Sequence, residues 1–184
     1  MVEKKRLFIS IELPQEIKLE LAKVCDHFAR KELFVGRCIK PENMHLTLQF
    51  LGSVYDNILP KIDRALKNVS FKSCKAKLGS LDVLPSKKKI KILFANLNSP
   101  TLHILAKQIE EVLSDIFESE TRDFKTHITI ARIKSIEDKD AFLEQVSYSE
   151  FAPLEFEITE FLLKESELTP EGSIYKTVSS YKLF

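Results

Sequence analysis

Hydrophobic and polar residues alternate along two short stretches of the chain, residues 44–50 (MHLTLQF) and 126–131 (THITIA). Alternation with a period of two is typical of a half-buried β-strand, because successive side chains point to opposite faces. In both stretches a His and the Thr two positions later share one face, and Leu or Ile residues occupy the other. We therefore expect two strands whose polar faces carry the same His-x-Thr-x pattern.

Similar patterns elsewhere predict an alternating series of strands and helices. Runs of apolar and β-branched residues predict strands, and apolar residues three or four apart predict amphipathic helices, two of them opened by Pro14 and Pro100. The expected strands are residues 6–13, 37–39, 44–52, 73–83, 90–97, 126–131, 154–164 and 174–183. The expected helices are residues 15–31, 56–69, 100–117 and 137–146.

The two halves of the chain repeat one order of elements. Phe8 and Phe94 each stand six residues before a Pro that opens a helix, and a His-x-Thr-x strand follows each helix. Residues of about 6–52 and 90–133 therefore resemble a duplicated strand-helix-strand unit. We expect residues 1–184 to form a single bilobal α+β domain: two pseudo-symmetric lobes, each an antiparallel sheet with helices on its outer face, flanking a central cleft.

Composition excludes several classes of protein. The apolar content of 44 % and the charged content of 30 % are those of a folded globular chain, and the net charge of +1 argues against a strongly basic, nonspecific nucleic-acid binder. The apolar run at residues 7–13 is too short for a signal peptide, and no stretch approaches a transmembrane length. We expect a cytoplasmic protein that does not associate with membranes.

Cysteine spacing gives a further expectation. Cys25, Cys38 and Cys74 are odd in number and form no Cys-x-x-Cys pair. Neither a disulfide framework nor a cysteine zinc site is indicated. We expect three reduced, mostly buried thiols.

The paired His-x-Thr strands suit chemistry at a phosphodiester. Imidazole titrates near pH 6.5, so one His can take a proton from the attacking oxygen while the other gives a proton to the leaving oxygen. The Thr hydroxyls can donate hydrogen bonds to the two remaining phosphate oxygens. This scheme needs no metal, and no Asp, Glu or Cys recurs at a spacing that would complete a zinc site with His45 and His127.

These motifs resemble the 2H phosphoesterase superfamily, and within it the RNA 2′,3′-cyclic phosphodiesterases, historically called 2′-5′ RNA ligases. The resemblance extends to residues 6–11 (RLFISI), 40–52 (KPENMHLTLQFLG) and 166–175 (SELTPEGSIY). One departure is Thr126, because the family commonly has Pro directly before the second His. It leaves His127 and Thr129 intact.

The resemblance implies a bilobal α+β fold, no metal or other cofactor, and a monomer. It implies hydrolysis of RNA 2′,3′-cyclic phosphate ends to 2′-phosphomonoesters, with reversible 2′-5′ RNA ligation as a side activity. Substrates would be RNA with such ends, tRNA halves included, or cyclic nucleotides. By analogy His45 is the proton donor to the leaving 3′ oxygen, His127 is the proton acceptor that activates water, and Thr47 and Thr129 complete the site.

Two alternatives remain open on the residues alone. The first is a noncatalytic module that binds RNA ends or nucleotides. The second is an enzyme of the same fold for another cyclic or 2′-5′ diester, such as an ADP-ribose cyclic phosphate. A bell-shaped dependence of turnover on pH would favour an enzyme over a binding module.

Several further residues are candidates for substrate binding. Arg132 falls on the opposite strand face if alternation holds, yet the family often carries a basic residue there; the alternative is a surface ion pair. Phe50, expected on the face of His45, would stack on a base or belong to the core. Tyr175 is a candidate from the C-terminal string. Basic residues that precede the two strands, and those of one charged hairpin, would contact RNA or be solvated: Arg37, Lys40, Arg122 and Lys125, and Lys87 to Lys89.

Overall fold

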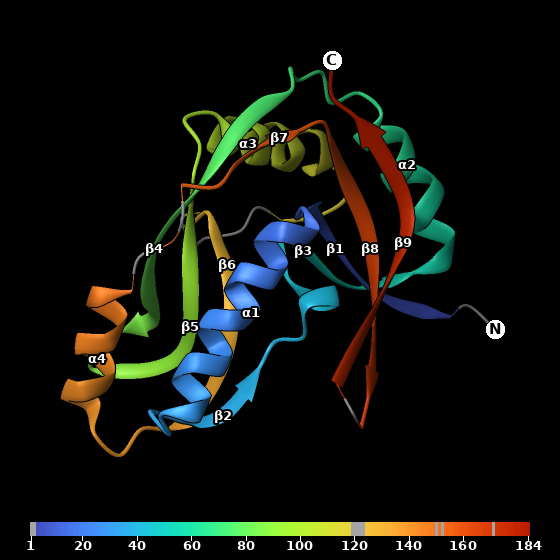
Figure 1. The fold of residues 1–184 in the computed structure, drawn as a ribbon. Coiled ribbons are helices and arrows are strands. Elements are labelled where there is room, and N and C mark those ends of the chain that lie inside the picture. Colours follow the sequence, from blue (N-terminus) through green and yellow to red (C-terminus); the bar gives the residue numbers. More distant parts are fainter. Residues whose placement is uncertain (1–2, 119–123, 150, 152, 171) are drawn as a thin grey trace.

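The computed structural model describes residues 3–118, 124–149, 151, 153–170 and 172–184. Its strands form one curled antiparallel sheet in the order β7-β4-β5-β6-β3-β1-β8-β9, with β2 paired to β6 (Figure 1). The strands are β1 (Lys4–Glu12), β2 (Val35–Cys38), β3 (His45–Tyr55), β4 (Cys74–Ser86), β5 (Lys89–Asn98), β6 (His127–Ser135), β7 (Glu155–Ile158), β8 (Glu160–Thr169) and β9 (Gly172–Lys182). The helices are α1 (Gln15–Arg30), α2 (Leu59–Leu66), α3 (Leu102–Leu113) and α4 (Lys139–Tyr148), with 3-10 turns η1 (Pro41–Asn43) and η2 (Asp56–Ile58).

The antiparallel α+β architecture that we predicted is confirmed, with one difference in how the two lobes meet. Strands β3, β1, β8 and β9 make one half of the sheet, and the other strands make the second half. Where the halves meet, β3 and β6 pair at Leu46 and Ile128. The two lobes are therefore joined in one sheet, not built on separate sheets.

The strand-helix-strand units β1-α1-β3 and β5-α3-β6 occupy equivalent places in the two halves. In each unit the two strands are antiparallel neighbours. Helix α1 of the first unit packs on β2 and β6 of the second half, and α3 packs back on β3. Each helix thus covers strands of the other half, which is the arrangement a duplicated unit with a pseudo-two-fold axis would adopt.

Two of the predicted elements differ from the observed ones. The helix expected at residues 56–69 begins with η2, and α2 starts at Leu59 with Pro60 in its first turn, where a missing backbone N–H is tolerated. The single strand expected at residues 154–164 is two strands separated at Thr159. Strand β7 pairs with β4, whereas β8 pairs with β1 in the other half, so the chain changes halves at this point.

The core lies on the sheet face opposite the His and Thr residues. Leu46 and Ile128 are fully buried there, as the alternation predicts. Helix α1 contributes Ile17, Leu21 and Phe28, which are also fully buried at helical spacing. None of the helices in the described part of the chain has the length and apolar character needed to cross a bilayer.

Cys25 and Cys38 form a disulfide, so our expectation of reduced thiols at these two positions was wrong. The bond joins α1 to β2, whose Cα atoms at these residues are 6.0 Å apart. Spacing along the chain did not reveal the pair, because the packing of the helix beside the strand brings the residues together. Cys74 is free and half-buried.

We expect this disulfide to stabilise the fold. It closes a loop with a sequence separation of 13 residues, and loops of this length correspond to about 2–4 kcal/mol through restriction of the unfolded chain. The Cys25→Ser/Cys38→Ser variant should lose that much free energy of unfolding in a urea titration, whereas Cys74→Ser should lose much less. Equal urea midpoints for the double variant and the wild type would contradict a stabilising role.

Candidate active site

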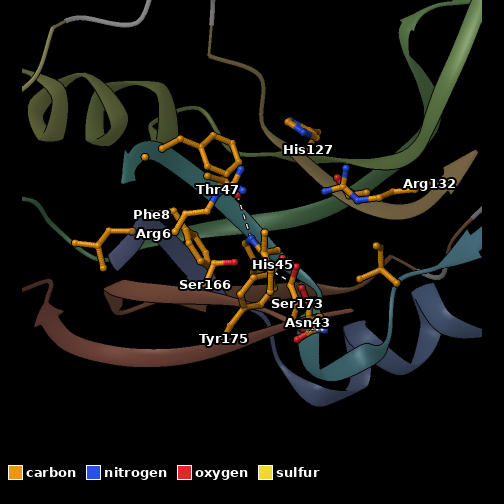
Figure 2. Close-up of a pocket in the computed structure, with 16 residues that line it drawn as sticks. Arg6, Phe8, Asn43, His45, Thr47, His127, Arg132, Ser166, Ser173 and Tyr175 are labelled. Carbon is orange, nitrogen blue, oxygen red and sulfur yellow. Dashed lines mark hydrogen bonds between the residues drawn. The ribbon is translucent and has the colours of Figure 1, made fainter. Parts of the chain in front are cut away.

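A cavity of about 420 Å³ opens on the sheet where the two halves meet (Figure 2). Seven of the residues that we predicted for the site line this cavity: His45, Thr47, Phe50, His127, Thr129, Arg132 and Tyr175. Nine further lining residues were not predicted: Arg6, Leu7, Phe8, Ile39, Asn43, Gly52, Ser166, Leu168 and Ser173. Eight of these nine lie within the strings that carried the family resemblance and Ile39 adjoins one of them, but no local pattern marked them as functional.

Strands β3 and β6 present their side chains to this cavity in the same way. The sequence of buried, half-buried and exposed positions is identical along residues 45–53 and 127–135. The His and Thr residues are half-buried and line the cavity, whereas the residues between them are buried on the core side. The two halves of the chain therefore supply equivalent His-Thr pairs to one site.

A β-bulge in each strand explains why Arg132 reaches the cavity. Phe94 pairs with Thr129 but Leu93 pairs with Ala131, so Ile130 is an extra residue in β6. An extra residue shifts the alternation by one position, which moves later side chains to the other face. Alternation, the condition under which Arg132 would lie on the opposite face, therefore does not hold here, and Arg132 lines the cavity.

The same irregularity occurs at the equivalent place in β3. Ser10 pairs with Thr47 and Ile9 pairs with Gln49, which makes Leu48 the extra residue. Under strict alternation, the side chain five positions after His45 would point away from the cavity. The bulge reverses this, so Phe50 lines the cavity, with 61 % of its surface exposed. Our placement of Phe50 was correct, but simple alternation does not account for it.

Both imidazoles are held by the same backbone contact. Nδ1 of His45 is 2.7 Å from the carbonyl oxygen of Asn43, and Nδ1 of His127 is 2.8 Å from the carbonyl oxygen of Lys125. Because a carbonyl oxygen only accepts, each Nδ1 carries the proton, which leaves Nε2 to take or give a proton. Nε2 of His45 is 3.1 Å from the Thr47 hydroxyl (Figure 2).

Aromatic side chains fix the two imidazole rings. The ring centroids of Phe8 and His45 are 5.0 Å apart, and those of Phe94 and His127 are 5.5 Å apart. Tyr175 meets His45 edge-on at 5.1 Å. Tyr175 therefore orients a candidate catalytic ring as well as lining the cavity.

The environment of His45 disfavours its charged form in the free protein. Burial lowers the pKa of His45 to about 4, the hydrogen bond to Asn43 opposes this shift, and the positive charge of Lys164 adds to it. Since this value lies well below 7, His45 is neutral at neutral pH when the cavity is empty.

Arginines supply the permanent charge around the cavity. Arg6 on β1 and Arg132 on β6 are exposed lining residues, and neither takes part in an ion pair within the described residues. Arg37 on β2 is the cross-strand partner of Arg132. Its Nη1 lies 3.7 Å from the position that a Cβ would take at Gly172 in the β8-β9 hairpin. Three guanidinium groups thus stand at or beside the opening.

The other basic candidates are placed differently. Lys40 and Lys125 are exposed and do not line the cavity, although Lys125 contributes the carbonyl that holds His127. Lys87 to Lys89 lie at the β4-β5 turn, outside the cavity lining. Arg122 lies outside the described residues.

The described residues contain no cluster of three or more His, Cys, Asp or Glu side chains that could hold a metal ion. The arrangement that they do contain is two imidazoles whose Nε2 atoms are not held by the backbone, two Thr hydroxyls and flanking guanidinium groups. Such a set can bind an anion and transfer protons on two sides of it.

Comparisons with known proteins find relatives of this chain along most of its length. A model of the family described as LigT like Phosphoesterase matches residues 11–94 and 97–175. The chain is 30 % identical over 177 residues to the RNA 2′,3′-cyclic phosphodiesterase of Methanocaldococcus jannaschii, covering 96 % of this chain and 99 % of that protein. It is 29 % identical to the protein of the same name from Thermotoga maritima, covering 94 % and 92 %.

Solved structures share the fold. The crystal structure of TT0787 of Thermus thermophilus has a TM-score of 0.77 at 25 % identity and covers 97 % of each chain. E. coli LigT complexed with 3′-AMP has a TM-score of 0.75 at 21 % identity, covering 98 % of this chain and 99 % of the other. The curled sheet is therefore common to this chain and to LigT.

Proposed function

Because this chain belongs to the LigT-like phosphoesterases of the 2H superfamily, we propose that it hydrolyses RNA 2′,3′-cyclic phosphodiester ends to 2′-phosphomonoesters by metal-independent acid-base catalysis. The observation that carries the proposal is the pair of imidazoles, one from each half, that line a single cavity. The names of its curated relatives support the same substrate class. Reversible 2′-5′ RNA ligation would use the same acid-base steps, with a hydroxyl of a second RNA end in place of water as the attacking group.

The proposed reaction uses both Nε2 atoms. One His takes a proton from water as its oxygen attacks the phosphorus, and the bond from phosphorus to the 3′ oxygen breaks. The other His gives its proton to that 3′ oxygen, which leaves a 3′ hydroxyl and a 2′-phosphate. The hydroxyls of Thr47 and Thr129 donate to the two non-bridging oxygens as negative charge builds there.

The family resemblance assigns His45 as proton donor and His127 as proton acceptor. The pKa of about 4 for His45 in the free protein favours the reverse order. A bound phosphodiester is an anion, and a nearby negative charge raises the pKa of an imidazole. We therefore propose that His45 gains its proton together with the substrate, and that Thr47, which hydrogen-bonds Nε2 in the free protein, is then released to the phosphate.

The remaining lining residues suit a nucleotide. Phe50 presents an exposed ring on which a base can stack. Arg132 and Arg6 can contact the phosphate charge, and we propose that Lys40 and Lys125, which are exposed outside the cavity lining, contact RNA phosphates. These assignments for Phe50, Arg132, Tyr175, Lys40 and Lys125 are proposals.

A direct test is to incubate the protein in EDTA with 2′,3′-cyclic nucleotides, a short RNA with a cyclic phosphate end, and a tRNA half. We expect hydrolysis of the cyclic RNA end, with the phosphate retained on the 2′ oxygen. A 3′-phosphate product or dependence on a metal would contradict the proposed mechanism. Binding of these ligands without turnover at any pH would favour a noncatalytic module.

We expect Arg132→Ala to weaken the use of substrate. Charge-assisted hydrogen bonds contribute about 1.5–3 kcal/mol, which corresponds to a fall of roughly 10- to 100-fold in kcat/KM. The dependence of KM on salt should become shallower, because one phosphate contact is lost. Arg64→Ala, at an exposed position on α2, is the matched control and should leave kcat/KM unchanged.

A further inference from the structure

A cluster of three charged side chains lies beside His45, across the pairing of β1 with β3. Glu12, the last residue of β1, is the cross-strand partner of His45. Its two carboxylate oxygens accept hydrogen bonds from two ammonium groups, one oxygen from Lys18 of α1 and the other from Lys164 of β8. Three separate elements therefore converge on the residue opposite His45.

The charges of this cluster are held away from water. The side chains of Lys18 and Lys164 are only 9 % and 8 % exposed, and that of Glu12 is 35 % exposed. Burial by itself raises the pKa of Glu12, but the hydrogen bonds and charges of Lys164 and Lys18 outweigh it, so the pKa lies below its ordinary value. With Glu12 ionised and both lysines charged, the cluster carries one net positive charge.

Among the described residues, the position across the strand from His127 carries no charge. The residue paired with His127 is the neutral Asn96 of β5. The Asn96 amide donates to the carbonyl and hydroxyl oxygens of Ser80, at 3.1 and 3.3 Å. The strands and the Nδ1 contacts of the two His residues are equivalent. Their surroundings differ in the angle of the neighbouring Phe ring, 34° at His45 and 76° at His127, and in the Thr47 and Tyr175 contacts of His45. Of the differences, the residue across the strand is the one that brings a charge.

The other ionisable groups around His45 are few. Tyr175 of β9 packs against its ring, and His127, Arg6 and Arg132 share the cavity. None of the three cluster residues lines the cavity, so they act on a bound substrate only through His45 or through their charge.

We propose that Glu12, Lys18 and Lys164 are positioning residues that make the two catalytic imidazoles unequal, because they fix a net positive charge beside His45, whereas the residue across the strand from His127 is the neutral Asn96. This inference rests on the proposed function for its role in turnover. A mechanism with one acid and one base needs two imidazoles of different proton affinity, and the pseudo-symmetric strands by themselves would make the two alike. The charge of the cluster makes the proton affinity of His45 different from that of His127.

The test is an NMR titration of the four histidines in the full-length protein, with each resonance assigned by a single His→Asn variant. In Lys164→Met the cluster loses its net charge, and the pKa of His45 should rise by about half a unit or more. In Glu12→Gln/Lys164→Met the cluster again has a net charge of about +1, from Lys18, so the pKa of His45 should return toward the wild-type value. The pKa of His127 should change less in both variants.

Restoration by the second substitution separates an electrostatic role from a structural one, because added damage to packing would not reverse the first shift. Lys5→Met is the matched control, since it removes an ion pair of 3.4 Å with Glu165 across the same two strands. If Lys164→Met does not fold, Lys18→Met tests the same loss of charge. An unmoved His45 pKa in a folded variant, or a shift that the double variant enlarges, overturns the proposal.

The dependence of kcat/KM on pH then shows which role the cluster serves. If His45 is the acid, Lys164→Met moves the alkaline limb to higher pH; if it is the base, the acidic limb moves instead. Movement of neither limb, despite a shifted His45 pKa, would overturn the role of the cluster in turnover. Absence of hydrolysis by the wild type would overturn the proposed function, while the NMR titration would still measure the charge effect.

Discussion

Replacing either His45 or His127 by alanine is expected to lower kcat for a 2′,3′-cyclic phosphate end by about 10²- to 10⁴-fold, the usual contribution of a positioned acid or base. The two imidazoles line the same cavity, and each is held by the backbone through Nδ1, which leaves Nε2 as the atom that exchanges a proton. The double variant should be little worse than either single one, because residues that act as a unit show strongly non-additive effects. Steady-state kinetics with a cyclic-phosphate dinucleotide measures all three.

The chain supplies its own controls for this experiment. His27 on α1 and His103 on α3 are exposed and lie outside the cavity lining. His27→Ala and His103→Ala should therefore keep wild-type turnover. Binding of the cyclic-phosphate dinucleotide to the His45→Ala and His127→Ala variants, followed by calorimetry, should persist. Near-normal hydrolysis by His45→Ala or by His127→Ala would refute the catalytic role of the replaced His.

The sequence was most informative where one local pattern was repeated. Leu46 and Ile128 are buried and the adjoining His and Thr residues face a cavity, because side-chain alternation depends only on local backbone geometry. The repeat then indicated that His45 and His127 belong to one site, which neither stretch indicates alone.

Features that depend on pairing between distant segments were not predictable in this way. The bulges at Leu48 and Ile130 are defined by the partner strands, and they decide where Phe50 and Arg132 point. They arise at equivalent positions in β3 and β6, so the strand irregularity is repeated along with the His-Thr motif.

The disulfide and the charged cluster were missed for a related reason. Cys25 and Cys38 meet because α1 packs beside β2, and no spacing rule encodes that packing. Glu12, Lys18 and Lys164 resemble ordinary amphipathic or surface charges in the sequence, and only the pairing of β1 with both β3 and β8 places them beside His45. The effect of residues that differ between the two halves on the catalytic site therefore becomes apparent only when the fold is known.

The junction of the two halves gives the second large prediction. Leu46 and Ile128 pair where β3 meets β6, and each directly follows a proposed catalytic His. Leu46→Ala should lower the free energy of unfolding by about 2–5 kcal/mol, the range for a buried leucine. Leu66→Ala on α2 is the matched control, because Leu66 is 1 % exposed and Leu46 is 0 % exposed.

The two variants should differ in turnover. A cavity left at Leu46 loosens the contact that sets His45 against His127, and a displacement of about 1 Å between reacting groups can lower a rate by about 10²-fold. At a temperature where both variants are folded, Leu46→Ala should lower kcat by about tenfold or more, whereas Leu66→Ala should leave kcat near the wild-type value. If both variants lose stability but keep equal kcat, then the packing between the two halves does not position the catalytic pair, and the rigidity of each strand is sufficient.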